Sequence, residues 1–390
     1  MSIIRRDSHN NNDVRPALDS FCRCIVIKIG SAVLLHDDGF SQDAFRNLVQ
    51  GVVEIRKRGI KVVVVCSGAV ALGMERLGLN KRPDNLSAVQ AVASVGQGIL
   101  AHKWSEELSH MNVSTAQILL THDDLHDRRR FISARNTLRA LINMDTVPII
   151  NENDAVAVDE IKMGDNDILA SIVVSLVDAD HLIICSSVEG LLTFEDGHEP
   201  RLISRVGEID VGIRRVVTQE KSSVGSGGMG TKLEAIHRVN KLGVSGQIVN
   251  GSLPGILLDC ASGKMVGTWF DAHEIRMNAR RHWIAYAKKS TGRVSVDQGA
   301  EEALRHQGKS LLPIGVTEIV GDFQEGDMIE ICDSQHRLLA VGLASLNAED
   351  SRKTIGLSSS QIKHIFGWHS VMVHRDDLVL VESSDFLLTH

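Results

Sequence analysis

Short apolar runs alternate with longer amphipathic segments along the first part of the chain. Cys24–Ile29 and Val62–Val65 are apolar on both faces, and each is soon followed by Gly and Ser. Similar runs follow at Thr115–Leu120, Val147–Ile150, His181–Cys185 and Gln247–Val249. Short runs without a polar face are typical of strands inside a parallel sheet that is covered on both sides.

Segments with helical periodicity lie between these runs. Phe45–Arg58 stops at Gly59, and Lys232–Lys241 is closed in the same way by Gly243,. The other expected helices are Leu86–Leu108 and residues 132–142. Strands that alternate with helices predict an α/β fold, here a three-layer αβα sandwich with a mainly parallel central sheet. Such sheets bind ligands at the carboxyl ends of their strands.

The pattern changes near residue 275. Residues 275–282 are basic and carry no strand signal, which suits a linker or a bridging helix. Short strand candidates follow, separated by Gly and Asp turns: Arg293–Val296, Gly315–Val320, Met328–Cys332, Leu338–Leu343 and Leu378–Glu382,. The first residues are polar and lack the apolar core of a signal peptide. We therefore expect a disordered extension over residues 1–20, an α/β domain over 21–272, a linker over 273–283 and a small β-rich domain over 284–385.

Charge narrows the possible partners. The chain has 390 residues, enough for two domains, and a formal net charge of −7,. From Ile284 onward it has 10 Lys and Arg against 15 Asp and Glu, and this balance opposes binding to a nucleic-acid backbone. The most apolar stretch, Ile168–Cys185, is interrupted by Asp178 and Asp180. It predicts a buried helix followed by a strand, and no membrane span.

The cysteines are scattered along the chain. They are Cys22, Cys24, Cys66, Cys185, Cys260 and Cys332. No pair has CxxC spacing and no histidines cluster at the spacing of a zinc site, so we expect no protein-held metal. Reduced thiols in the cytoplasm are the simplest interpretation.

Candidate anion sites follow the first two strands. Lys28 lies inside an apolar strand, just before Gly30 and Ser31, and a buried ammonium group needs an anionic partner. It either reaches a phosphate over the Gly-Ser turn or extends its stem to water at a frayed strand end. Ser67 and Gly68 lie where the second strand passes into a helix, and backbone N–H groups there can hold a carboxylate or phosphate. An ordinary tight turn uses the same small residues.

Two polar clusters follow the strand that ends at Ile150. NENDAV (151–156) comes directly after it, and GDND (164–167) lies shortly beyond. Together they supply Asn151, Glu152, Asn153, Asp154, Asp165, Asn166 and Asp167. Such groups can bind an α-amino group, position a metal–nucleotide or orient lysines, although turns and helix caps favour the same residue types. Two clusters in succession favour a ligand site.

The segment SVGSGGMGTK (223–232) carries the densest glycine signal. Residues 225–230 match GxGxxG, but the preceding VVTQEKSS is not the buried strand that a dinucleotide-binding fold requires,. The order Gly-Thr-Lys also differs from the Gly-Lys-Thr of a Walker A loop. A glycine-rich loop that opens a helix and delivers Lys232 at its start suits a nucleotide phosphate. A flexible linker is the alternative.

Taken in order, KIGS, CSGAVALG, NENDAV, KMGDND and SGGMGTK resemble the amino-acid kinase family, in particular its branch that phosphorylates the side-chain carboxylate of glutamate. The resemblance spans about residues 22–270 and includes THDDLHDRRRFISARNTLRALI (121–142). The later segments GKSLLPIG (308–315), VGDFQEGD (320–327) and VHRDDL (373–378) resemble a PUA domain. Five motifs in the family's order make this resemblance specific.

The resemblance implies roles for individual positions. Lys28 and Lys232 would flank the transferring phosphoryl group, and Asp167 would hold the two lysines in place. Glutamate would be bound by Ser67, Asp154 and Asn166, with Asp165 close by. ATP would be held by Lys28, Gly30, Ser31, Ser186, Ser187, Ser226, Gly227, Gly228, Met229, Gly230, Thr231 and Lys232. Mg²⁺ would be carried mainly by the ATP phosphates.

The implied reaction converts L-glutamate to L-glutamate 5-phosphate, the first step toward proline. The resemblance further implies feedback inhibition by proline, a homodimer or homotetramer, and a cytoplasmic location. Two positions depart from the family: Ser186-Ser187 stands where Thr-Asp is common, and Ala32 stands where a small hydroxyl residue is frequent. Three alternatives stay open: a kinase for another carboxylate or carbamate, an RNA-binding protein that uses the terminal domain, and a regulatory paralogue with weakened ATP binding.

Overall fold

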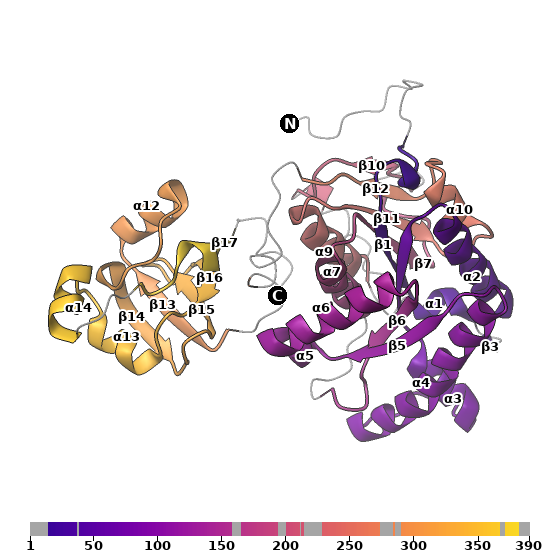
Figure 1. Ribbon diagram of the computed structural model, residues 1–390, viewed down its shortest axis with the longest axis horizontal. Helices are drawn as coiled ribbons and strands as arrows, with labels where there is room; N and C mark the ends of the chain where they lie inside the picture. Colours follow the sequence, from indigo (N-terminus) through magenta and orange to yellow (C-terminus); the bar gives the residue numbers. More distant parts are fainter. Residues whose placement is uncertain are drawn as a thin grey trace. The chain divides into compact units, whose positions relative to one another are not determined.

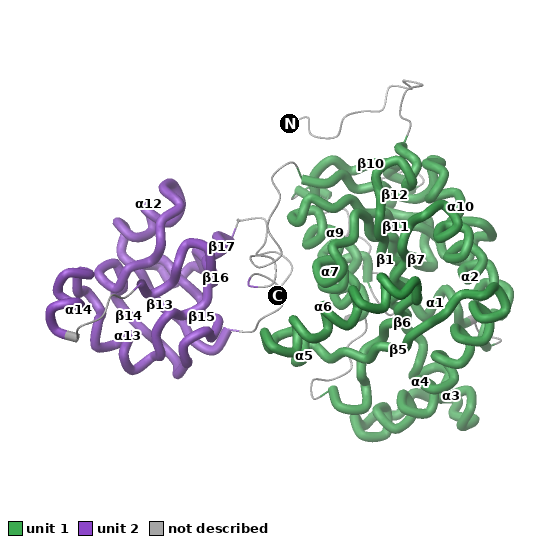
Figure 2. Tube along the Cα trace, in the orientation of Figure 1, with its two compact units in different colours: residues 1–276 green, residues 277–390 purple. Residues whose placement is uncertain are grey.

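The chain divides into two compact units, residues 1–276 and residues 277–390 (Figure 2). The computed structural model describes residues 15–36, 39–157, 165–193, 200–210, 212–213, 228–273, 284, 290–366 and 371–381. The side chains of residues 36 and 165 lie outside this description. The predicted linker over residues 273–283 lies outside the described residues except for its first position.

The first unit is built on a sheet in the order β10-β12-β11-β7-β1-β4-β6-β5. Its strands are β1 (Cys24–Ile29), β4 (Lys61–Cys66), β5 (Thr115–Leu120), β6 (Val147–Glu152), β7 (His181–Ser186), β10 (Arg205–Val206), β11 (Ser245–Asn250) and β12 (Thr268–Phe270). Neighbouring strands are parallel except for β11 and β12. The predicted mainly parallel sheet is therefore confirmed, and the strand predictions agree closely with the structure.

Helices cover both faces of this sheet (Figure 1). One layer contains α6 (Arg128–Asn143), α7 (Asp165–Val177) and α9 (Met229–Lys241), and the other contains α2 (Gln42–Lys57), α4 (Leu86–Ser109) and α10 (Ile256–Ala261). Trp104 of α4 packs edge-on against Phe45 of α2 with ring centroids 4.9 Å apart, and both side chains are fully buried. The three-layer αβα prediction is confirmed.

Shorter elements complete the first unit. They are η1 (Leu18–Ser20), α1 (Ser31–Leu34), β2 (Leu35–His36), β3 (Gly39–Phe40), α3 (Ala69–Leu77), α5 (His122–His126), β8 (Leu192–Thr193) and β9 (Arg201–Leu202). Helix α3 lies tightly on α4. A Cβ atom on Gly73 would stand 1.9 Å from the carbonyl oxygen of Val92, and one on Gly96 would stand 1.7 Å from that of Ala69. Only glycine at both positions permits this backbone approach.

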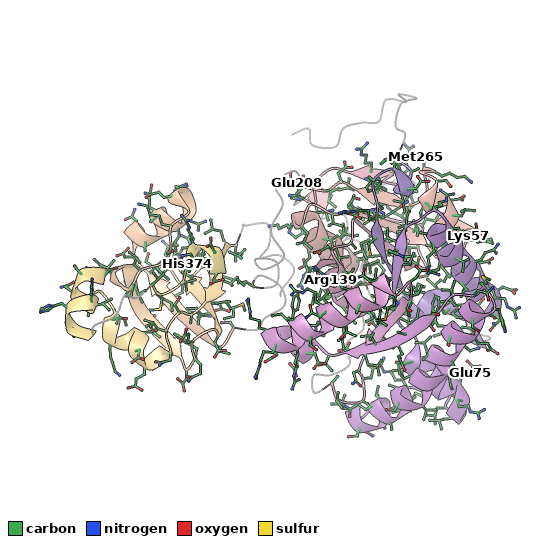
Figure 3. All side chains as sticks on the ribbon, viewed as in Figure 1. Lys57, Glu75, Arg139, Glu208, Met265 and His374 are labelled. Carbon is green, nitrogen blue, oxygen red and sulfur yellow. The ribbon has the colours of Figure 1, made fainter. Side chains whose placement is uncertain are left out.

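The most apolar stretch forms α7 and β7, the predicted helix followed by a strand. Arg139 of α6 donates to the carbonyl oxygen of Leu176 and pairs with Asp178, which ties α6 to the end of α7. Arg139 is labelled in Figure 3. Among the helices of the described residues, none combines the length and apolar character that crossing a bilayer requires.

The second unit contains a sheet in the order β14-β13-β15-β16-β17. The strands are β13 (Gly292–Val296), β14 (Val316–Gly321), β15 (Met328–Cys332), β16 (Leu338–Leu343) and β17 (Leu378–Leu380), and the helical segments are α12 (Gln298–Gln307), η2 (Pro313–Gly315), α13 (Ala348–Thr354), α14 (Ser359–Phe366) and η3 (Arg375–Asp377). The β-rich prediction is confirmed, although the helices were not predicted. Asp297 accepts from the N–H of Ala300 and caps α12, and Gly308 ends it with a φ of 57°.

The prediction of disorder over residues 1–20 is wrong for its last part. Residues 18–20 form η1, and Leu18 is fully buried. The guanidinium of Arg15 donates to the carbonyl oxygens of Val266, Ser204 and Gly267. A cation held by three backbone acceptors fixes this segment to the sheet edge. Residues 1–14 lie outside the described residues.

Candidate active site

Lys28 is a buried cation in the middle of the sheet. Every residue of β1 is buried, and Lys28 lies in register with Val65 of β4 and Ile184 of β7. Only 5% of Lys28 is exposed. The snorkelling alternative is therefore wrong, because the ammonium group has no path along the strand to water and must be neutralised inside the protein.

Asp167 supplies that neutralising charge. It lies in the first turn of α7 and is 0% exposed. Its Oδ1 lies 2.6 Å from Lys28 Nζ, and its Oδ2 lies 3.5 Å from Lys232 Nζ. Thr231 Oγ1 also donates to Oδ2 at 2.9 Å. Two ammonium groups thus share one carboxylate, which leaves a net positive charge in a buried place.

Burial and neighbouring charges shift the pKa values of Asp167 and Lys232 in opposite directions. Burial opposes the ionised form of Asp167, but the ammonium groups of Lys28 and Lys232 outweigh it and hold the pKa of Asp167 below its ordinary value,. Burial lowers the pKa of Lys232 below its ordinary value, with Asp167 opposing that shift and Lys28 adding to it. The carboxylate is consequently ionised at neutral pH, and Lys232 releases its proton more readily than a free lysine.

Glycines border the cationic cluster. Gly30 follows β1, and a Cβ atom on it would stand 3.7 Å from Lys28 Nζ and 3.4 Å from the carbonyl oxygen of Cys185. Gly228 caps α9, and a Cβ atom on Gly230 would meet no described atom within 4 Å. Within the part of the chain that the structure describes, a Cβ atom on Gly30, Gly228 or Gly230 would meet no side chain within 4 Å other than that of Lys28, which suits the close approach of a phosphate,. Ser226 and Gly227 lie outside the described residues.

A hydrogen-bond network joins the ends of β4 and β6 to α7. Asn166 Nδ2 donates to Ser67 Oγ at 2.9 Å and to Asn151 Oδ1 at 3.2 Å. Asn151 Nδ2 donates to Gln97 Oε1 at 2.7 Å. Asn166 Oδ1 is buried and has no hydrogen-bond partner among the described residues. A buried, unused acceptor beside a cationic cluster suits an N–H donor of a ligand, such as an α-ammonium group.

The remaining predicted site residues lie in turns and at the ends of helices and strands of the first unit. Asp154 is partly buried in the turn after β6, and the backbone of Asp165 begins α7. Ser31 begins α1 next to Gly30, with Ala32 following in the same helix. Ser186 is the buried last residue of β7, whereas Ser187 is exposed.

Sequence reasoning missed Gln97. It lies on α4, outside every sequence motif, and joins the cluster through a hydrogen bond with Asn151. No local signal marks it, because a glutamine inside a long helix is ordinary. Asn151 itself was grouped with the polar cluster but was given no role, and the structure places it between Gln97 and Asn166.

The first unit is an α/β structure with an open, mainly parallel sheet, and the buried cationic cluster lies near the carboxyl end of β1. Sheets of this class bind ligands at the carboxyl ends of their strands, and positive charge there suits an anionic ligand. Comparison with known proteins then gives the family. Residues 23–250 match the amino acid kinase family, and residues 292–366 match the PUA domain. The chain belongs to the amino acid kinase family and is an enzyme of that family, with a C-terminal PUA domain.

Relatives match along nearly the whole chain. Glutamate 5-kinase from Syntrophotalea carbinolica is 41% identical over 371 residues, which cover 94% of this chain and 100% of that protein. Glutamate 5-kinase from Myxococcus xanthus is 40% identical over 372 residues, covering 94% and 98%. Among solved structures, carbamate kinase from Giardia lamblia bound to AMP-PNP has a TM-score of 0.48 at 15% identity, covering 65% of this chain and 100% of that one. That structural likeness is too distant to carry an argument.

Proposed function

We propose that this enzyme transfers the γ-phosphoryl group of ATP to the side-chain carboxylate of L-glutamate, giving L-glutamate 5-phosphate in the first step of proline biosynthesis. The observation that carries the proposal is the pair of buried ammonium groups on Asp167, with Lys28 Nζ at 2.6 Å and Lys232 Nζ at 3.5 Å. Its two relatives named above, similar over both units, are glutamate 5-kinases.

The chemistry needs alignment and charge stabilisation. A carboxylate is already ionised at neutral pH, so its oxygen attacks the γ-phosphorus without a general base. The new O–P bond forms as the bond to the β,γ-bridging oxygen breaks, and ADP leaves with that electron pair. Lys28 and Lys232 stabilise the charge on the transferring group, and Asp167 keeps both ammonium groups aimed at it.

Recognition of glutamate is assigned to the network that ends β4 and β6. Ser67 and Asn166 are hydrogen-bonded to each other, and Asn166 Oδ1 is the unused acceptor that would receive the α-ammonium group. Asp154, in the turn after β6, is proposed to add a carboxylate to this site. Because Asn166 and Ser67 are uncharged, they do not form an ion pair with the attacking carboxylate of glutamate, which stays free to react.

Nucleotide binding is assigned to the glycines that border the lysines. The open backbone at Gly228 and Gly230, together with Gly30, fits the close approach of phosphates,. Ser31 lies just after β1, and Ser186 and Ser187 lie at the end of the neighbouring strand β7, so all three are at the carboxyl ends of parallel strands. Mg²⁺, carried on the phosphates, would reduce their negative charge.

The test is ATP-dependent hydroxamate formation from glutamate and hydroxylamine, with aspartate and N-acetylglutamate as matched alternatives. An acyl phosphate is trapped by hydroxylamine, whereas simple ATP hydrolysis gives no hydroxamate. We expect kcat/KM for glutamate to exceed that for either alternative by about 100-fold, since aspartate is one methylene shorter and N-acetylglutamate lacks the α-ammonium group. Equal or better use of another acid would overturn the substrate assignment.

Three further properties belong to the same proposal. Added proline should inhibit the reaction, the protein should be a homodimer or homotetramer, and it should act in the cytoplasm. All six cysteines are free and buried, which agrees with a reducing compartment,. Kinetics with proline, light scattering and fractionation test these points separately.

A further inference from the structure

Thr268, the first residue of β12, is a buried hydroxyl with two backbone partners. It is 0% exposed. Its Oγ1 accepts from the N–H of Leu191 at 2.8 Å and donates to the carbonyl oxygen of Ile203 at 2.7 Å. The N–H of Ile203 in turn donates to the carbonyl oxygen of Leu191 at 2.8 Å. One hydroxyl therefore connects β12 to the chain beyond β7 and to the chain beyond β9.

The segment that Thr268 holds is the post-β7 loop, residues 187–191. This loop touches β12 directly, because a Cβ atom on Gly190 would stand 2.5 Å from Thr268 Oγ1 and 2.9 Å from its backbone nitrogen. Gly267 has a φ of +60°, and a Cβ atom on it would stand 3.1 Å from the carbonyl oxygen of Glu189. Two glycines thus let the backbones meet, and the hydroxyl fixes the distance between them.

The other end of the post-β7 loop is also anchored. The carbonyl oxygen of Ser186, just before the loop, accepts from the N–H of Gly251 at 2.9 Å. A loop held at both ends presents its exposed residues in a defined place, and Ser187 is the first of them.

The turn that carries Thr268 has its own supports. Gln247 Nε2 donates to the carbonyl oxygen of Val266 at 2.6 Å, and Arg15 donates to those of Val266 and Gly267. Met265, labelled in Figure 3, is 46% exposed at the start of this turn. The turn is therefore fixed, because the buried side chains of Gln247 and Arg15 hold its carbonyl oxygens by hydrogen bonds.

We propose that Thr268 is a positioning residue for the nucleotide site, acting through the post-β7 loop. The inference rests on the proposed ATP-binding role of Ser186 and Ser187. Without the hydroxyl, the Leu191 N–H and the Ile203 carbonyl lose a buried partner, and the loop moves to find replacements. ATP binding weakens as a result, whereas glutamate recognition by Ser67 and Asn166 is unaffected.

The experiment compares Thr268→Val, which keeps the shape and removes the hydroxyl, with Thr268→Ser, which keeps the hydroxyl. ATP Kd is measured by calorimetry, and glutamate KM by turnover at saturating ATP. We expect Thr268→Val to raise the ATP Kd on the order of tenfold, the effect of one buried hydrogen-bond partner, and to leave glutamate KM within about twofold. Thr268→Ser should restore the ATP Kd to within about threefold of wild type.

Thr354→Val is the matched control. Thr354 is also 0% exposed, and its Oγ1 donates to the carbonyl oxygen of Ser351 at 2.9 Å in the second unit. A general loss of stability would lower Tm in both valine variants with no change in ATP Kd, and that result overturns the proposal. Equal losses for ATP and glutamate, or a serine variant as defective as the valine variant, also overturn it. Wild-type protein that binds ATP without phosphorylating glutamate would overturn the proposed function and leave the Thr268 result standing.

Discussion

Replacing Asp167 with asparagine removes the single negative charge between two buried ammonium groups while keeping the side chain's shape. With an effective dielectric constant of about 20, opposite charges 2.6 Å apart attract by about 6 kcal/mol and those 3.5 Å apart by about 5 kcal/mol,. These gross values are offset by the desolvation of all three groups. Variants that leave a buried charge unpaired lose about 3–5 kcal/mol, and we expect Asp167→Asn to fall in that range.

Urea unfolding and steady-state kinetics measure the two consequences. The free energy of unfolding should drop by about 3–5 kcal/mol, and kcat should fall at least about 100-fold because the lysines lose their alignment. ATP should stabilise the variant more than it stabilises wild type, since its phosphates replace the missing carboxylate as partner for Lys28 and Lys232.

Asp145→Asn is the matched control. Asp145 also pairs with two cations, Lys61 at 2.7 Å and Arg56 at 3.0 Å, but its side chain is 68% exposed. Exposed pairs contribute about 0–1 kcal/mol, so this variant should be nearly as stable and as active as wild type. Equal stability losses in the two variants, or an Asp167→Asn enzyme within a few-fold of normal kcat, would refute the reasoning.

Two further predictions concern pH and glutamate. Burial lowers the pKa of Lys232 in the free enzyme, so kcat/KM for ATP should fall on a single-proton limb at a pH below the ordinary lysine value of 10.5, and Lys232→Arg should abolish that limb,. The stability contribution of this group rises with pH in the same window, because the unfolded chain binds the proton more tightly, so a parallel loss of stability would contradict the assignment. Asn166→Ala should raise glutamate KM on the order of 10- to 100-fold with ATP KM nearly unchanged, which is the effect of a lost hydrogen bond to a charged group. Asn240→Ala is its control, because Asn240 is a buried asparagine outside the proposed site whose Nδ2 donates to the carbonyl oxygen of Val244.

Most of the sheet could be predicted from the sequence because its strands are apolar on both faces. Cys24–Ile29 was predicted within its observed bounds, and Lys28 was recognised as an anomaly in that apolar run. Long helices with glycine stops, such as α2, were predicted equally well. Strand β12 was missed, because a strand of three residues, Thr268–Phe270, has no detectable alternation.

The chemistry of the site was harder to place from sequence. The pairing of Lys28 and Lys232 through Asp167 depends on how three segments far apart in the sequence meet in the fold. It could be expected only from the family resemblance, which rests on the order of the motifs. Gln97 could not be found, because its role comes from the packing of α4 on the carboxyl ends of the strands. Arg15 was assigned to a disordered extension because its partners are backbone carbonyls, which sequence patterns do not reveal.

The most direct test of the central claim is the turnover of Lys232→Ala beside its binding of glutamate. Lys232 shares Asp167 with Lys28, whereas the network proposed to bind glutamate is built on Asn166 and Ser67. The account predicts that kcat falls by about 100-fold or more while glutamate affinity stays within a few-fold of wild type. Near-normal kcat in this variant would contradict the claim that two fixed ammonium groups act together on the transferring phosphate.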